Sequence, residues 1–403
     1  MANYNEENIN IPTGAERSYK GMQLNDYREE TRSRRGSMDL PYLLITIILL
    51  AVGVVMVLSA SFARAYYDIE HVTGGNATYY FVRQTLFAVS GLMIMLLVSR
   101  FKVSTFRRFS VLLMVIALVF LCAVPAVGTR VNGAKRWISL GFTTFQPSEI
   151  AKIALILLFA AMICRFGDKM KTFKYGVLPF GIVMLVIVGL LLLEPHLSAS
   201  IIILALGAAM MFAGGTRLRY FGIAAIVILL AGLVIVKNMD YAAARIASWK
   251  DPFSDLRGDG WQTVQSLYSV GSGGLLGVGL GQSRQKYLYL PEEHNDFIFS
   301  VVCEELGFVG ALLILALFAM LIVRGYWIAM NAKNKFGSLV ATGITTLLAL
   351  QVFLNVAVIT NLVPCTGISL PFFSYGGTAL WLQLAETGIM LSISREIPVK
   401  KAG

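Results

Sequence analysis

Long runs of hydrophobic residues alternate with short polar segments along most of the chain. Ten such runs are present, at approximately 40–62, 81–99, 107–127, 148–164, 175–193, 196–213, 219–237, 297–323, 337–361 and 372–393. Each is close to the ~20 residues that an α-helix needs to cross ~30 Å of hydrocarbon. The pattern therefore predicts an all-α polytopic membrane protein with about ten transmembrane helices.

The composition excludes several other classes of protein. Of the 403 residues, 57% are hydrophobic and only 14% are charged, whereas a soluble domain carries roughly 25% charged residues. A soluble enzyme, a nucleic-acid binder and a disordered scaffold are thus excluded as descriptions of the whole chain. The four cysteines lie in or beside apolar runs without metal-ligand or redox spacing, so neither a zinc site nor a disulfide framework is indicated.

The net charge of +11 is best explained by membrane topology. If the N-terminus is cytoplasmic, most of the Lys and Arg residues fall in cytoplasmic segments, as the positive-inside rule requires. We therefore predict that both termini are cytoplasmic and that nucleic acid is not a partner. The predicted organisation is a disordered cytoplasmic tail (1–39), a ten-helix transmembrane domain (40–396) and a cytoplasmic C-terminal tail (397–403).

Two segments predicted at the outer face are longer than simple connections. They are 128–147 and the large outer loop 238–296, between the seventh and eighth runs. Ordered loops of this length are usually functional. The large loop contains a Gly-rich stretch and ends at Asp296, where the eighth run begins. A carboxylate at this interface should have a raised pKa, which suits a proton acceptor. Alternatively, Asn295 or Asp296 caps the following helix.

The shorter outer segment gathers positive charge. Arg130, Lys135 and Arg136 precede Trp137, a combination suited to phosphate oxygens at headgroup level, although ordinary binding of anionic headgroups is the alternative. Lys152 lies just inside the fourth run, three residues after Glu149 and on the same face. An ionisable residue within a span is a functional hypothesis by default, and its alternative is an ion pair with Glu149 that only fixes packing.

Further polar residues interrupt the apolar runs. Glu304 and Glu305 lie within the eighth run, either facing a cavity or pairing with a buried cation such as Lys152. Glu194-Pro195-His196 offers an acid and an imidazole, and we interpret it as a solvated outer turn. The Gly-, Pro- and Ser-rich stretch 367–378 predicts irregular backbone, which is tolerated at membrane depth only inside protein or along a wet cavity. Close helix packing through small residues is the alternative.

These segments together resemble the SEDS family (shape, elongation, division and sporulation), which includes FtsW, RodA and SpoVE. The matching stretches are Leu58–Ser61, Val131–Ile138, Gln146–Lys152, Leu290–Phe299, Glu304–Gly307 and Gly367–Thr378, spread over residues 39–396. Residues 279–287 are more similar to the FtsW and SpoVE branch than to RodA. His196 stands where relatives often carry Asp, which weakens an acid role for that turn.

The resemblance implies an inverting peptidoglycan glycosyltransferase that polymerises lipid II at the outer face of the bacterial cytoplasmic membrane, an activity of septal or sporulation cell-wall synthesis. Asp296 matches the family's essential acid and would be the catalytic base. The predicted substrate-binding residues are Arg130, Lys135, Arg136, Trp137, Lys152, Glu149, His294, Glu304, Glu305 and Ser374.

The implied partners are lipid II, the undecaprenyl-pyrophosphate-linked glycan, a class B penicillin-binding protein and other divisome or sporulation membrane proteins. No resident cofactor is required, although a divalent cation, Mg or Mn, would also stabilise the departing diphosphate. Two alternatives remain open: a lipid II flippase, which would need a polar path across the whole membrane, and a non-catalytic division scaffold.

Overall fold

The computed structural model describes residues 36–69, 72–131, 134–141, 143–194, 196–238, 240–256, 258 and 260–398. Within them, each predicted run forms a helix: α2 (Leu40–Tyr67), α3 (Tyr79–Val98), α4 (Val103–Val127), α5 (Pro147–Phe166), α7 (Leu178–Leu193), α8 (Leu197–Ala213), α9 (Leu218–Asn238), α12 (Ile298–Asn331), α13 (Lys335–Ile359) and α14 (Gly377–Ser394). Seven of the described helices are long and apolar enough to cross a membrane, and α8 is apolar but shorter. The predicted all-α polytopic class is confirmed.

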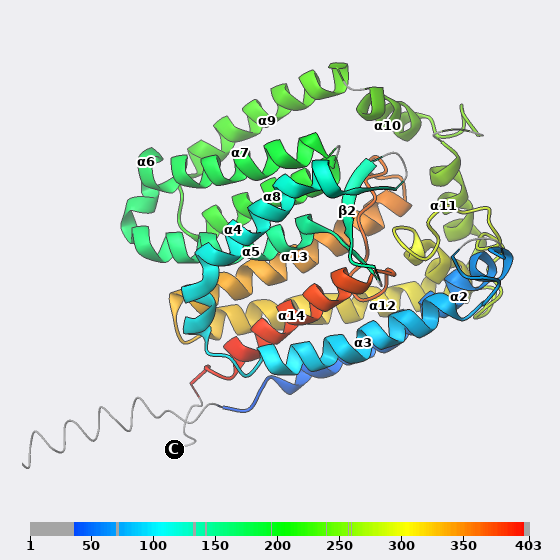
Figure 1. Cartoon of the computed structure of the whole chain (residues 1–403), viewed down its shortest axis with the longest axis horizontal. Helices are drawn as coiled ribbons and strands as arrows, with labels where there is room; N and C mark the ends of the chain where they lie inside the picture. The colour runs from blue at the N-terminus through cyan, green and yellow to red at the C-terminus, as the bar shows by residue number, and fades with distance from the viewer. Residues whose placement is uncertain are drawn as a thin grey trace, which may run out of the picture.

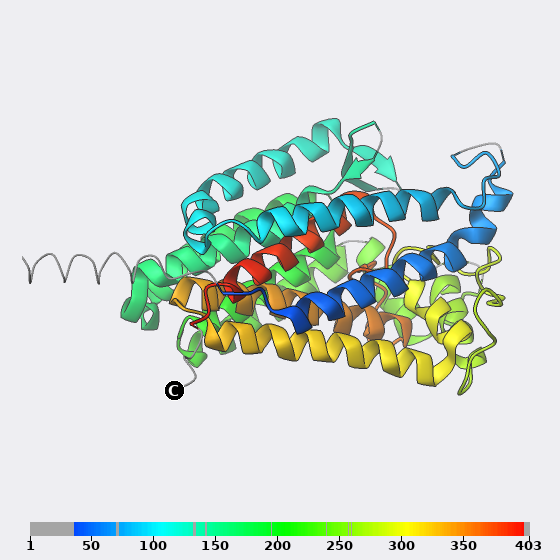
Figure 2. The ribbon, with the colours of Figure 1, turned by 90° about the horizontal axis from the view of Figure 1, so that it is seen from below.

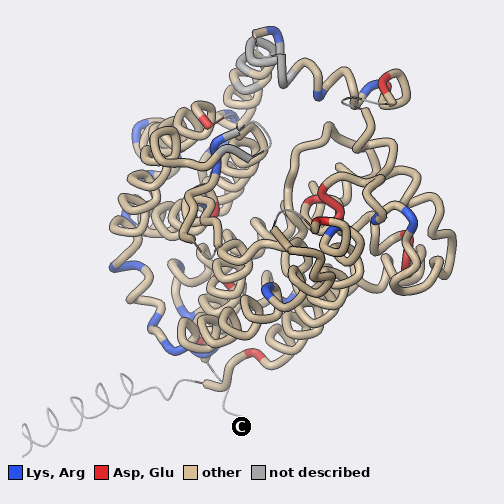
Figure 3. Tube along the Cα trace, turned by 45° about the vertical axis from the view of Figure 1, so that its right-hand side comes forward, with Lys and Arg blue, Asp and Glu red and all other residues tan. Residues whose placement is uncertain are grey.

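The long helices run side by side (Figures 1 and 2), and α9 follows one edge of the bundle in Figure 1. One end of the bundle carries the strands, α10 (Asp240–Lys250) and α11 (Trp261–Ser272). The opposite end carries the short helices η1 (Gly167–Lys171) and α6 (Phe173–Gly176) and the α12–α13 turn. Many Lys and Arg residues gather toward this second end (Figure 3), as the predicted topology requires.

Both ends of the described chain meet at the same side of the bundle. The backbone N–H of Gly36 donates to the carbonyl of Arg395 at 2.9 Å. Asp39 accepts from the backbone N–H of Tyr42 and forms an ion pair with Arg324 at 2.8 Å. Residues 36–39 were predicted as part of the disordered tail. They pack against the bundle instead, because Gly36 bonds to Arg395 and Asp39 both caps α2 and pairs with Arg324. Residues 1–35 and 399–403 of the predicted tails lie outside the described residues.

The helices differ in how much of their surface is buried. More than half of the apolar window of α5 and of α13 is buried, whereas α3, α4 and α7 leave most of theirs on the surface. Exposed Leu, Val and Ile side chains on the outer helices suit a hydrocarbon solvent, in which burying apolar surface gives little driving force. Side chains on α5 and α13 therefore face protein in nearly every direction.

The segment 128–147, expected as a loop, forms a small antiparallel sheet of β1 (Thr129–Val131), β2 (Ala134–Ser139) and β3 (Thr144–Phe145). Arg130 opposes Lys135 between β1 and β2, and Ile138 opposes Phe145 between β2 and β3. The dipeptide Asn132-Gly133, which lies outside the described residues, is a hairpin signal in the sequence. The sheet fixes the direction of the basic side chains on β2.

Helix α12 is interrupted at Gly307, whose backbone is left-handed in φ (65°). The Gly-rich part of the outer loop fills this break. The N–H groups of Val278 and Gly279 donate to the carbonyls of Glu304 and Glu305 at 3.0 and 3.1 Å, and those of Phe308 and Val309 donate to Gly274 and Leu275 at 2.9 and 3.1 Å. Two carbonyls and two N–H groups of α12 that lose their helical partners at the break therefore form hydrogen bonds to the loop. A helix that is interrupted within a membrane needs such partners from the protein.

Candidate functional site

Asp296 lies in the last residues of the outer loop, directly before α12. Phe297 occupies the capping position of α12, so the alternative that Asn295 or Asp296 caps this helix is wrong. The backbone of Asp296 is held by α13 instead, because the amide nitrogen of Asn355 donates to its carbonyl at 2.8 Å and to the carbonyl of Ile368 at 2.7 Å. The carboxyl group of Asp296 therefore has no capping role at the start of α12.

Ser374 fixes the neighbouring residue from the segment that precedes α14. Its hydroxyl donates to the carbonyl of Asn295 at 2.7 Å and accepts from the backbone N–H of Leu370 at 2.7 Å. The N–H of Tyr375 also donates to the carbonyl of His294 at 2.9 Å. The irregular segment 367–376 therefore supports the loop that presents Asp296, through the hydroxyl of Ser374 and the backbone N–H of Tyr375.

The side chain of Asp296 is partly buried against Gly367, where a Cβ added to the glycine would lie 3.0 Å from Oδ2. Burial, and then the charge of Glu292, raise the pKa of Asp296 to about 7, although Arg136 and Arg245 act in the opposite direction. A carboxyl group that titrates near neutral pH can accept a proton from a substrate hydroxyl. This arrangement is suited to general base catalysis.

Two arginines bring positive charge to this acid. Arg136 lies on β2 and Arg245 lies on α10, where its guanidinium donates to the carbonyl of Cys365 at 3.3 Å. Arg245 was missed in the sequence because a single cation in a long polar loop carries no spacing signal.

The other predicted residues of this segment have different contacts. Lys135, which is also on β2, donates to the carbonyl of Pro125 at 3.1 Å, and Trp137 opposes Thr129 in the sheet. The side chain of Arg130 lies outside the described part of the structure.

Lys152 is buried in α5 and forms an ion pair with Glu149 at 2.7 Å. This contact confirms that the two side chains share one face of the helix. The pair brings one positive and one negative charge into the protein, so its net charge is close to zero, although the ammonium retains further donor capacity. The binding role of both residues stays a prediction.

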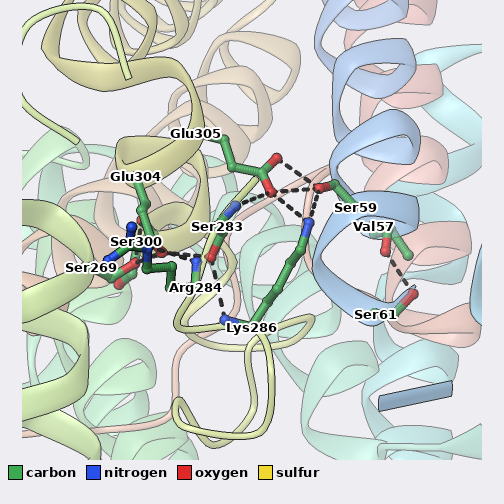
Figure 4. A network of polar contacts seen from close by, with 10 residues as sticks. All are labelled: Val57, Ser59, Ser61, Ser269, Ser283, Arg284, Lys286, Ser300, Glu304 and Glu305. Carbon is green, nitrogen blue, oxygen red and sulfur yellow. Dashed lines mark hydrogen bonds and ion pairs between the residues drawn. The ribbon is translucent and has the colours of Figure 1, made fainter. Parts of the chain in front are cut away.

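Glu304 and Glu305 are held by the outer loop, with Ser283 between the two carboxylates (Figure 4). Glu305 pairs with Lys286 at 2.8 Å and accepts from Ser59 on α2 at 2.7 Å. Glu304 accepts from the hydroxyl of Ser283 at 2.5 Å and from the backbone N–H of Arg284. The buried cation is therefore Lys286 and not Lys152, and these contacts anchor the loop to α2 and α12.

His294 is buried among aromatic rings, with ring centroids 4.6 Å from Tyr80 and 5.8 Å from Tyr375. The preceding residue, Glu293, accepts two hydrogen bonds from the guanidinium of Arg64 on α2, at 2.6 and 2.8 Å. The loop that ends at Asp296 is therefore fixed by α2, α3 and the segment before α14. In this position His294 contributes packing, and its substrate-binding role stays a prediction.

Metal-binding side chains do not gather anywhere in the described chain: no group of three or more His, Cys, Asp or Glu residues could hold an ion there.

The chain is similar to a known protein family and to several of its members. A family model for FtsW, RodA and SpoVE, described as cell cycle protein, matches residues 40–398. Stage V sporulation protein E of Bacillus subtilis is 40% identical over 366 residues, which cover 90% of this chain and 98% of that protein. A probable peptidoglycan glycosyltransferase FtsW of Geobacter sulfurreducens is 41% identical over 364 residues, 89% of this chain and 95% of the relative.

Solved structures have the same architecture. A chain from a peptidoglycan synthase complex, described as coordinating polymerization and crosslinking, superimposes with a TM-score of 0.72 at 28% identity and covers 89% of this chain and 98% of that one. The rod shape determining protein RodA of Thermus thermophilus superimposes with a TM-score of 0.64 at 27% identity, covering 90% and 98% of the two chains.

Proposed function

Because the chain belongs to the family of FtsW, RodA and SpoVE, we propose that it polymerises lipid II into glycan strands at the outer face of the bacterial cytoplasmic membrane. It is a peptidoglycan glycosyltransferase and a multi-pass membrane protein. The observation that carries the proposal is the position of Asp296 directly before α12, a carboxyl with a pKa of about 7 within the electrostatic reach of Arg136 and Arg245.

In the proposed reaction, Asp296 accepts the proton of the GlcNAc 4-hydroxyl of lipid II. The hydroxyl oxygen forms a bond to the anomeric carbon of the lipid-linked chain, and the bond from that carbon to the diphosphate oxygen breaks. The electron pair of the broken bond leaves on undecaprenyl pyrophosphate, which needs no protonation. A single displacement converts the α-linked donor into a β-linked product, so the reaction is inverting.

The leaving diphosphate requires positive charge that is fixed before the reaction. Arg136 and Arg245 are close enough to Asp296 to lower its pKa, and guanidinium groups match phosphate oxygens with paired donors. We propose that these arginines hold the diphosphate and that Lys152 contributes from α5. A divalent cation such as Mg or Mn would supply the same stabilisation, held chiefly by the substrate.

The partner in this proposal is a class B penicillin-binding protein, whose transpeptidase domain would cross-link the new strand. The structural similarity to a chain of a complex that coordinates polymerization with crosslinking supports it. Similarity to SpoVE and FtsW supports a role in septal or sporulation wall synthesis, with the protein concentrated at the septum among other divisome or sporulation proteins.

The deciding experiment uses the purified complex with its penicillin-binding partner and supplied lipid II. Asp296→Asn should abolish formation of glycan polymer while the complex still assembles and still binds lipid II. Asp255→Asn, in the exposed part of the same outer loop, is the matched control and should polymerise normally. Retained polymerisation by Asp296→Asn would remove the proposed base, and a wild-type complex that only moves lipid II between leaflets would favour a flippase.

A further inference from the structure

The turn between α7 and α8 is buried, contrary to the solvated turn expected from its sequence. Glu194 is 2% exposed and His196 is 7% exposed. The backbone N–H groups of both residues donate to the carbonyl of Leu191 at 3.2 and 3.0 Å, which folds the turn back onto the end of α7. An acid and an imidazole are therefore enclosed at the outer end of the bundle.

The polar atoms of this turn have hydrogen-bonding capacity that the described residues leave unused. Both carboxyl oxygens of Glu194 and Nδ1 of His196 are buried without a hydrogen-bond partner there. The hydroxyls of Ser148 and Thr366 are in the same condition. Because buried polar groups in folded proteins nearly always have partners, these atoms are available to hydrogen-bond a bound molecule.

Arg136 and the segment that contains residue 366 link this turn to Asp296. The charge of Arg136 acts on Glu194, on His196 and on Asp296 alike. The hydroxyl of Ser198, at the start of α8, donates to the carbonyl of Thr366, and a Cβ added to the next residue, Gly367, would lie 3.0 Å from Oδ2 of Asp296. Nε2 of His196 lies 3.4 Å from the amide nitrogen of Gln146, at the start of α5.

The chemistry of the turn favours a neutral ligand. Burial raises the pKa of Glu194 to about 8, against the effect of Arg136. Burial, with the charges of Arg136 and Lys152, lowers the pKa of His196 to about 3. Both groups are therefore neutral near pH 7. The protonated carboxyl of Glu194 can both donate and accept, and His196 can donate from Nδ1 while its Nε2 faces the amide nitrogen of Gln146. Hydroxyl and amide groups need such donor–acceptor pairs, whereas a diphosphate needs cations.

We infer that Glu194 and His196 form a saccharide-binding subsite beside Asp296, which accepts the hydroxyl and acetamido groups of the lipid-linked substrate. The inference rests on the proposed function, since that function supplies a sugar headgroup at this face. It assigns Glu194 and His196 a binding role and leaves the proton transfer to Asp296. The subsite would hold the sugar while the arginines hold the diphosphate.

The test measures binding of two probes to the full-length protein in nanodiscs: lipid II, which carries the disaccharide, and undecaprenyl pyrophosphate, which carries none. Glu194→Ala and His196→Ala should each weaken lipid II binding by about tenfold, the effect of losing a hydrogen bond or two, and leave undecaprenyl pyrophosphate binding unchanged. Arg136→Ala should weaken both. Lys250→Ala, at an exposed position of the outer loop, should change neither.

Glu194→Gln tests whether Glu194 binds the sugar as a neutral group. The side chain keeps its size, so this variant also shows whether a loss of binding in Glu194→Ala is caused by misfolding. An amide keeps a donor and an acceptor, so this variant should bind lipid II within about twofold of the wild type. The inference is overturned if Glu194→Ala weakens both probes equally or neither, or if Glu194→Gln is as defective as Glu194→Ala. These assays need no polymerisation, so they can fail while the proposed function stands, or succeed while it falls.

Discussion

The carboxylate of Asp296 lies against the backbone of Gly367, and a Cβ at position 367 would be 3.0 Å from Oδ2. Gly367 has a φ of +64°, a backbone conformation that residues with a Cβ atom rarely adopt. Asn355 links the same two segments by donating to the carbonyls of Asp296 and Ile368. The position of the acid is therefore set by the irregular segment before α14 as much as by its own loop.

Gly367→Ala should displace the carboxylate of Asp296 and lower the rate of polymerisation. The new methyl group meets Oδ2, and the left-handed backbone costs a residue with a Cβ roughly 1–2 kcal/mol. A shift of about 1 Å at a reacting group can reduce the rate about 100-fold. The measurement is single-turnover polymerisation of lipid II by the partner complex, alongside lipid II binding.

Binding should survive this substitution, because the arginines that would hold the diphosphate are not touched. Gly271→Ala is the matched control, since a Cβ there meets no atom within 4 Å. Equal rates for Gly367→Ala and wild type would show that the contact with Gly367 does not set the position of Asp296.

The rate of polymerisation should depend on the ionisation of Asp296. Only the deprotonated carboxylate can accept a proton, so kcat/KM should rise about tenfold per pH unit at acidic pH and level off above the pKa of about 7. Glu292 raises this pKa, and therefore Glu292→Gln should move the midpoint to lower pH. A profile whose midpoint is the same in Glu292→Gln and in wild type would contradict the assigned electrostatics.

Much of the fold could be predicted because helix formation in a membrane leaves a direct mark on the sequence. Each run of about twenty apolar residues became a helix, since a spanning segment must satisfy all its backbone groups internally. The run at 372–393 was placed too early, because Phe372 and Phe373 are apolar yet precede the helix that begins at Gly377. Hydropathy alone does not distinguish a buried irregular segment from a helix.

The site was only partly predictable for a related reason. Asp296 and Arg136 belong to recognisable stretches, but their proximity depends on how β2 and the loop before α12 come together. The burial of Glu194 and His196 could not be inferred from a short polar turn. His196 lies against Gln146, directly before α5, and Ser198, two residues further on, bonds to residue 366, so the partners of this turn lie far away in the sequence.

Gly307→Ala should destabilise the protein and release the Gly-rich segment from the break in α12. Gly307 has a φ of 65°, and an added Cβ would lie 2.2 Å from the backbone nitrogen of Gly277, which has no flexible end to move. We expect a loss of about 3 kcal/mol in the free energy of unfolding. Limited proteolysis should then cut within residues 273–289 faster than in wild type.

The control for this substitution is Gly189→Ala in α7, where a Cβ meets open space. Because alanine favours a helix over glycine, this variant should unfold at least as late as wild type and resist proteolysis equally. Unchanged cleavage of the loop in Gly307→Ala would indicate that the four backbone hydrogen bonds across the break do not hold the segment in place.

Lys286 and Glu305 form a buried ion pair between the outer loop and α12. The side chains are 2% and 0% exposed, and their charged atoms are 2.8 Å apart. Lys286→Met should lower the free energy of unfolding by about 3–5 kcal/mol because it leaves the carboxylate of Glu305 buried without its cation. Arg284→Ala, an exposed side chain two residues away in the same loop, should have little effect.

Glu305→Gln added to Lys286→Met should recover much of the lost stability. The glutamine is neutral and can still accept hydrogen bonds from Ser59 and from the backbone N–H of Ser283. Equilibrium unfolding in mixed micelles of the wild type, both single variants and the double variant gives the coupling energy, which we expect to exceed about 1.5 kcal/mol. Additive losses would mean that Lys286 and Glu305 contribute independently, and that the loop is held to α2 and α12 by its other hydrogen bonds.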